Sequence, residues 1–87
     1  MATELIHIGF GNVLAVNRVI AVVSPTSAPS KRLAQEAKKT GKLVDMTHGR
    51  RTKAIIVMDS GHLVLAGITP ETVMGRLSLV RDALVRT

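Results

Sequence analysis

The sequence predicts a single α+β domain, residues 1–87, in which a small and mainly antiparallel sheet carries two helices. Short runs of β-branched and aliphatic residues, bounded by Gly and Asn, predict the strands. Two longer segments combine helix-start signals with helical spacing of apolar residues. The chain has 87 residues and is 46% hydrophobic, which is enough for one small core. A core of this size is commonly stabilised by self-association.

The strands are predicted from apolar runs that lie between turn residues. The expected strands cover residues 5–8, 13–16, 19–23, 43–47, 50–58 and 63–66. A turn at His48 and Gly49 is expected to join 43–47 and 50–58 as a hairpin. The run 19–23 shows no alternation of polar and apolar residues. We therefore expect both of its faces to be buried, one of them against a neighbouring subunit.

The first helix is expected between Ser27 and Thr40. Ser27 can cap its N-terminus, Pro29 falls in the first turn, where no backbone donor is needed, and Gly41 stops it. The apolar stripe of this helix is narrow. Its other side is basic and comprises Lys31, Arg32, Lys38 and Lys39.

The second helix is expected from Thr69 to the C-terminus. Thr69 can cap it, Pro70 suits the first helical position, and Glu71 is favourable at the positive end of the helix dipole. Its apolar residues at helical spacing are Val73, Leu77, Val80 and Leu84. One small sheet face does not need this much apolar surface. We therefore expect this helix and the 19–23 strand to form subunit contacts in a homo-oligomer larger than a dimer.

Charge and aromatic content indicate the kind of partner. Twelve Lys and Arg oppose six Asp and Glu, giving a net charge of +6 and a pI near 10.9. This balance favours a polyanion. Phe10 is the only aromatic residue among Phe, Tyr and Trp. Proteins that bind single strands stack bases on aromatic rings, so duplex nucleic acid is the expected ligand.

A cluster of cations lies beside the predicted His48–Gly49 turn. Arg50, Arg51 and Lys53 fall within four residues, and a turn that opens into a strand would hold them on ordered backbone. Arginine offers planar, bidentate donors that match phosphate oxygens. Arg18 interrupts two apolar runs. It is either a phosphate or base contact of a nucleic acid, or a residue with a structural role, as a turn cation or in a salt bridge to Glu4 or Asp45.

The sequence offers no credible catalytic set. There is no cysteine, and the three histidines are widely spaced, with no partner at metal-ligand separation. We therefore expect no enzyme activity, no metal and no cofactor. The longest purely apolar runs have five residues, far short of a membrane span, and the N-terminus lacks the basic region of a secretory signal. A cytoplasmic protein is expected.

Several co-linear motifs resemble the RemA family of bacterial extracellular-matrix regulators. The resemblance spans about residues 5 to 78 and rests on Ile8-Gly9-Phe10-Gly11-Asn12, Asn17-Arg18, Ser24-Pro25, Ser27-Ala28-Pro29, Gly49-Arg50-Arg51-Thr52, Met58-Asp59-Ser60 and Pro70-Glu71-Thr72-Val73. The chain departs from the family pattern at His48, where the family has Tyr, and at Ser30, where it has a bulky apolar residue. It is also less acidic around Glu36.

The resemblance implies a non-enzymatic, ring-forming DNA-binding protein that activates transcription of biofilm-matrix genes. It also implies that Arg18, Arg50 and Arg51 contact DNA and that the segment around Pro29 is functionally sensitive. Combined with the charge pattern, the expected DNA-binding set is Arg18, Lys31, Arg32, Arg50, Arg51 and Lys53. Two alternatives stay open: a duplex-RNA-binding module, and a structural assembly protein that binds acidic partners.

Overall fold

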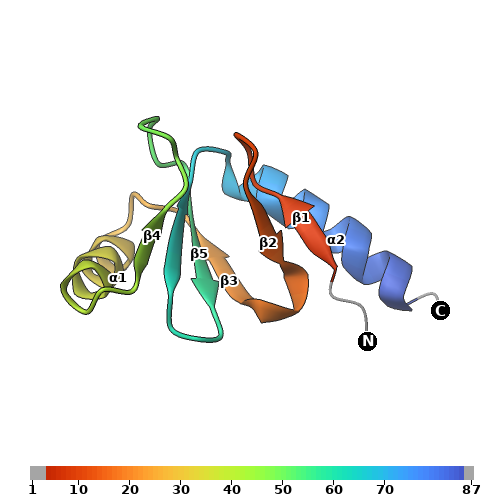
Figure 1. Ribbon diagram of the computed structural model, residues 1–87, viewed down its shortest axis with the longest axis horizontal. Helices are drawn as coiled ribbons and strands as arrows, with labels where there is room; N and C mark the ends of the chain where they lie inside the picture. Colours follow the sequence, from red (N-terminus) through yellow and green to blue (C-terminus); the bar gives the residue numbers. More distant parts are fainter. Residues whose placement is uncertain (1–3, 86–87) are drawn as a thin grey trace.

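The computed structural model describes the backbone of residues 4–85 and the side chains of residues 4–79 (Figure 1). Its elements are β1 (Leu5–His7), β2 (Val13–Ala15), a 3-10 turn (Val16–Arg18), β3 (Val19–Val23), α1 (Ala28–Lys39), β4 (Leu43–Asp45), β5 (Ala54–Met58), β6 (Leu63–Ala66) and α2 (Pro70–Val85). The α+β class is confirmed. The strands, however, form two sheets where one was expected: a β1–β2 hairpin, and a four-stranded sheet in the order β3-β5-β6-β4.

The expected hairpin of residues 43–58 is wrong. β4 pairs in parallel with β6, which separates β4 from β5. The strands are shorter than expected, and residues 46–53 between them form a loop. Both ends of this loop donate to β6: Met46 N–H to the Leu65 carbonyl, and Lys53 N–H to the Ala66 carbonyl. An apolar run predicts a strand but not the strand with which it pairs. The loop of residues 46–53 is long enough to pass the end of β6, so β6 can lie between β4 and β5.

Both predicted helix starts are confirmed. The Ser30 backbone N–H donates to Ser27 Oγ over 3.2 Å, and the Thr72 N–H donates to Thr69 Oγ1 over 3.3 Å. α1 ends at Lys39 with Thr40 as its C-cap, and Gly41 follows with φ of 73°. In α2, Val73 and Leu77 are buried as their spacing predicted. The side chains of Val80 and Leu84 lie outside the described residues.

The four-stranded sheet forms the middle of three layers. One face, including Ile56 and Val64, packs on the β1–β2 hairpin and on Val73 and Leu77 of α2. The other face, including Ile55, packs on α1, as Figure 1 shows. None of the helices described by the structure is long and apolar enough to cross a membrane.

β3 differs from the expectation that both of its faces are buried. It is an edge strand, and a bulge interrupts its register between Val19 and Ala21. Ile20, at this bulge, has 65% of its surface exposed. Among residues 4–85, one long edge of β3 has no strand partner, because β5 pairs with the other. Such an edge leaves backbone hydrogen-bonding groups available.

Candidate nucleic-acid interface

The loop of residues 46–53 has a defined backbone. His48 and Gly49 both adopt left-handed conformations, with φ of 55° and 79°. The Arg50 N–H closes the turn by donating to the Thr47 carbonyl over 3.1 Å. Glycine adopts this conformation freely, whereas a non-glycine residue such as His48 needs local hydrogen bonds to hold it. The turn predicted at His48 and Gly49 is therefore present, although it joins no hairpin.

Asp45 supplies those local bonds at the start of the loop. Its Oδ1 accepts from the Thr47 N–H over 2.9 Å and from Thr47 Oγ1 over 2.6 Å. Thr47 is only 2% exposed, so its hydroxyl depends on this acceptor. The two hydrogen bonds from Thr47 hold the pKa of Asp45 below its ordinary value, and the positive field of His48 adds to them.

Asp45→Ala should destabilise the fold, because it leaves the buried Thr47 hydroxyl without its acceptor. We expect a loss of about 1–2 kcal/mol in the free energy of unfolding, measured by urea denaturation at pH 7. Asp45→Asn keeps an acceptor and should lose less.

Because the folded-state pKa is lowered, the charge of Asp45 stabilises the fold above pH 3.8 and loses that effect as the pH falls through the folded pKa. The wild-type advantage over Asp45→Asn should shrink on acidification. An advantage that grows toward acid would contradict this assignment.

Arg50 lies on the ring of Phe10. Its Cζ is 3.9 Å from the ring centroid, a cation–π contact, and the His48 ring is 6.2 Å from the same ring, centroid to centroid. The turn that carries Phe10 is tied to the loop, because Asn12 Nδ2 donates to the Met46 carbonyl over 3.0 Å. The sequence reasoning did not assign Phe10 to the site, although a single aromatic residue within a Gly-rich turn was the available signal.

Arg51 and Lys53 follow on the same loop, and both are exposed. The Lys53 backbone N–H donates to the Ala66 carbonyl over 2.8 Å, which fixes the point where the loop joins β5. The structure therefore brings Arg50, Arg51 and Lys53 together on one ordered, exposed loop. We call these three residues the loop cations.

Arg18 lies elsewhere. β3 runs antiparallel to β5 with Val19 opposite Met58, so Arg18 lies beside the C-terminal end of β5, whereas the loop cations precede its N-terminal end. The Arg18 Nη1 pairs with Asp59 Oδ2 over 3.2 Å, and the Arg18 carbonyl accepts from the Asp59 N–H. The expectation of Glu4 or Asp45 as the ion-pair partner is wrong. The reason is that the pairing of β3 with β5 brings the Asp59 turn to Arg18.

The ion pair leaves Arg18 accessible, since 64% of its side chain and 41% of that of Asp59 are exposed. Exposed pairs of this kind contribute little to stability. Lys31 and Arg32 are exposed on α1, in a separate layer of the fold (Figure 1). Within one chain, the six predicted contacts thus form three groups: Arg18, the α1 pair, and the loop cations.

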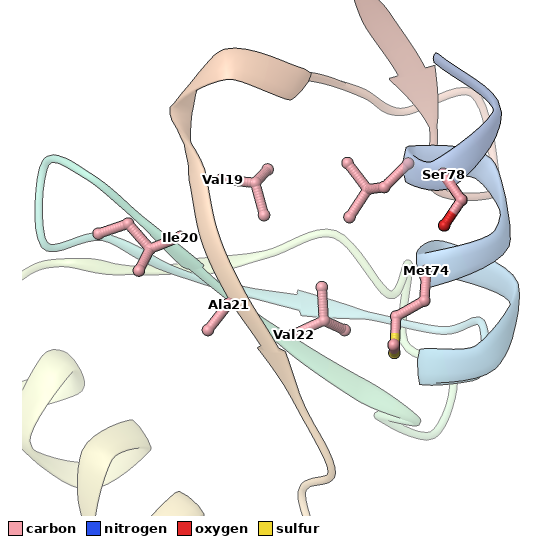
Figure 2. Close-up of a pocket in the computed structure, with 7 residues that line it drawn as sticks. Val19, Ile20, Ala21, Val22, Met74 and Ser78 are labelled. Atoms are coloured by element: carbon pink, nitrogen blue, oxygen red, sulfur yellow. The ribbon is translucent and has the colours of Figure 1, made fainter. Parts of the chain in front are cut away.

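An apolar pocket of about 210 Å³ lies between β3 and α2. Figure 2 shows Val19 and Val22 of the strand facing Met74 and Ser78 of the helix. The side chains of Ile20 and Met74 beside it are 65% and 55% exposed. The residues that line the pocket are called the β3–α2 groove: Val19, Ile20, Ala21, Val22, Met74, Leu77 and Ser78. It coincides with the two elements that the sequence predicted as subunit contacts.

The fold and these features define a small, basic α+β protein that carries arginines on an ordered loop beside a three-layer core. In the described residues, no three His, Cys, Asp or Glu side chains cluster as they would to hold a metal ion. Comparison with known proteins gives the family. The chain belongs to the RemA-like family, described as extracellular matrix regulatory protein A-like, whose sequence model matches residues 5–77.

Relatives named as candidate regulatory proteins extend this match over nearly the whole chain. A protein of Dehalococcoides mccartyi is 59% identical over 86 residues, covering 99% of this chain and 90% of its own. One from Halothermothrix orenii is 62% identical over 78 residues, covering 90% and 93%. One from Bacillus velezensis is 51% identical over 84 residues, covering 97% and 94%.

Proposed function

We propose that this protein is a cytoplasmic, duplex-DNA-binding transcriptional regulator that works as a ring-shaped homo-oligomer. A regulatory role is supported by the family and by the names of its relatives. The resemblance to matrix regulators favours activation of biofilm-matrix genes. The main support for DNA binding is the loop of residues 46–53. The Asp45–Thr47 hydrogen bonds fix its backbone, and its arginines are exposed.

Phosphate recognition is the chemistry that this loop supports. A guanidinium group can donate two parallel hydrogen bonds to a phosphate, and a fixed backbone reduces the entropy lost on binding. Contacts to the edges of the bases would need side chains on a helix or strand that enters a groove of the DNA. The loop cations are suited to positioning contacts along the DNA backbone, and these contribute affinity more than sequence preference.

The separation of Arg18 from the loop cations is the reason to combine this proposal with an oligomer. The two groups lie at opposite ends of β5 in one chain, so in a single copy they are two separate and small basic sites. Repetition around a ring would convert them into an array that duplex DNA can follow or bend along. The β3–α2 groove and the unpaired edge of β3 are the surfaces that we assign to subunit contacts.

A competition experiment tests the choice of ligand. Fluorescently labelled random duplex DNA bound to the protein is challenged with unlabelled duplex DNA, duplex RNA, single-stranded DNA and polyglutamate at fixed salt. We expect duplex DNA to compete best, because few aromatic side chains are available for stacking. Preferential competition by duplex RNA would favour the RNA-binding alternative. Equal competition by polyglutamate would favour a protein that binds acidic partners.

A further inference from the structure

Phe10 occupies a position that its own packing does not explain. Phe10 is 40% exposed, and its backbone has φ of 55°, a conformation that an aromatic residue rarely adopts. It does not belong to the buried core of the sheet. Backbone strain that places an apolar ring at the surface often accompanies a functional constraint.

Hydrogen bonds of its turn and the close approach of Gly67 define where the ring lies. The turn beneath it is closed by the Asn12 N–H, which donates to the Gly9 carbonyl over 3.0 Å, and by the Ile8 N–H, which donates to the Asn12 carbonyl over 3.0 Å. The Asn12 side chain joins this turn to the arginine loop. Gly67, at the end of β6, lies so close that a Cβ added there would be 2.8 Å from Phe10 Cε2. The ring therefore lies against the backbone at Gly67, where an added Cβ would have to displace it.

Arg50 uses the ring as a platform. The guanidinium carbon lies over the ring, 3.9 Å from its centroid, and a contact through the carbon does not use the N–H donors, which lie in the plane of the group. Within the described residues, no hydrogen bond or ion pair involves the Arg50 side chain. The contact with Phe10 thus restricts the rotamers of Arg50 while it leaves the phosphate-binding donors free. Restriction before binding lowers the entropy lost when the complex forms.

We propose that Phe10 is a positioning residue that pre-orients Arg50 for a phosphate of the nucleic-acid backbone, with Gly67 keeping the space that the ring requires. This inference rests on the proposed function, since it concerns how one of the proposed contacts is presented. It assigns to the Gly9–Asn12 turn a role in binding through Arg50, without direct contact between Phe10 and the nucleic acid.

A double-mutant cycle on duplex-DNA affinity tests the proposal. The variants are Phe10→Leu, Arg50→Ala and the combination, measured by fluorescence anisotropy at one salt concentration. We expect Phe10→Leu to weaken binding about 2- to 5-fold, in the range of a surface cation–π contact. In the Arg50→Ala background, Phe10→Leu should have little further effect. In an Arg51→Ala background, its effect should persist. Phe10→Tyr, which keeps the ring, should bind within about twofold of wild type.

A glycine pair provides a matched test that leaves Phe10 and Arg50 unchanged. Gly67→Ala should displace the ring and weaken binding as Phe10→Leu does, whereas Gly75→Ala, in α2 with nothing within 4 Å of the added Cβ, should leave binding unchanged. A second readout needs no DNA. The Arg50 side-chain protons should show a ring-current shift in the NMR spectrum of the free protein, and Phe10→Leu should abolish it.

The outcomes separate this inference from the proposed function. If Arg50→Ala leaves DNA affinity unchanged, Arg50 is not a contact and the DNA-binding role proposed for it fails. If Arg50→Ala weakens binding but Phe10→Leu weakens the Arg50→Ala variant just as much, Phe10 acts by general support of the fold and the positioning role is wrong. Absence of the ring-current shift in the wild type would also overturn the positioning role.

Discussion

Arg51→Ala should weaken duplex-DNA binding by at least about 1–2 kcal/mol per contributing protomer, the range of a hydrogen bond to a charged group. Arg51 is exposed on the ordered loop, so its removal deletes the proposed phosphate contact without opening the core. Several protomers engaged on one DNA would multiply the loss. The measurement is DNA affinity at fixed salt, with the particle size checked by size-exclusion chromatography.

Lys39→Ala is the matched control for Arg51→Ala, because both remove one positive charge. Lys39 lies at the exposed end of α1, on a flexible side chain that adds diffuse attraction. It should therefore cost less. Arg18→Ala should also weaken DNA binding. Its effect should be smaller than that of Arg51→Ala to the extent that the Arg18 guanidinium stays paired with Asp59 in the complex. Two results would contradict binding through arginines on ordered backbone. One is that Lys39→Ala weakens DNA binding as much as Arg51→Ala. The other is that the arginine variants lose binding only because their oligomers dissociate.

Met74→Asp should convert the proposed oligomer into a species with the 9.3 kDa mass of one chain. Met74 is 55% exposed beside the β3–α2 groove, so a charge there disturbs little of the chain's own core but would be buried without a partner in a subunit contact. Ile20→Asp should act in the same way. DNA affinity should fall about 100-fold or more, because the arginines of separate protomers no longer bind as a unit.

Leu33→Asp is the control for this prediction. Leu33 is 48% exposed on α1, away from the groove, and receives the same change in charge and polarity. Light scattering at micromolar concentration should find its oligomer intact. A wild-type protein that is itself monomeric, or an intact Met74→Asp oligomer, would show that the groove is not the subunit contact.

The sequence predicted the helices best because their signals are local. Ser27 and Thr69 each cap their own helix through a residue three positions later, so no distant contact was needed to place them. Strand neighbours depend on distant residues. The position of β6 between β4 and β5 could not be read from the run 43–58 itself, since each strand is apolar enough to pair with any of the others.

The candidate site was predictable in its residues but not in its geometry. The cluster of Arg50, Arg51 and Lys53 is evident from spacing, and the structure holds these residues on one loop. That Arg18 meets Asp59, and lies at the other end of β5, follows from the pairing of β3 with β5. The contact between Phe10 and Arg50 depends on two turns, at Gly9–Asn12 and at His48–Gly49, that are far apart in the sequence and meet in the fold.

The central claim is that arginines repeated on an oligomer bind the phosphates of duplex DNA. The most direct test is the dependence of the binding constant on salt, measured with random duplex DNA. If two protomers each place three arginines on phosphates, about six phosphates are neutralised, and log K should fall against log salt with a slope of roughly −5. A slope near zero would contradict the claim, because it would mean that the basic groups do not face the DNA.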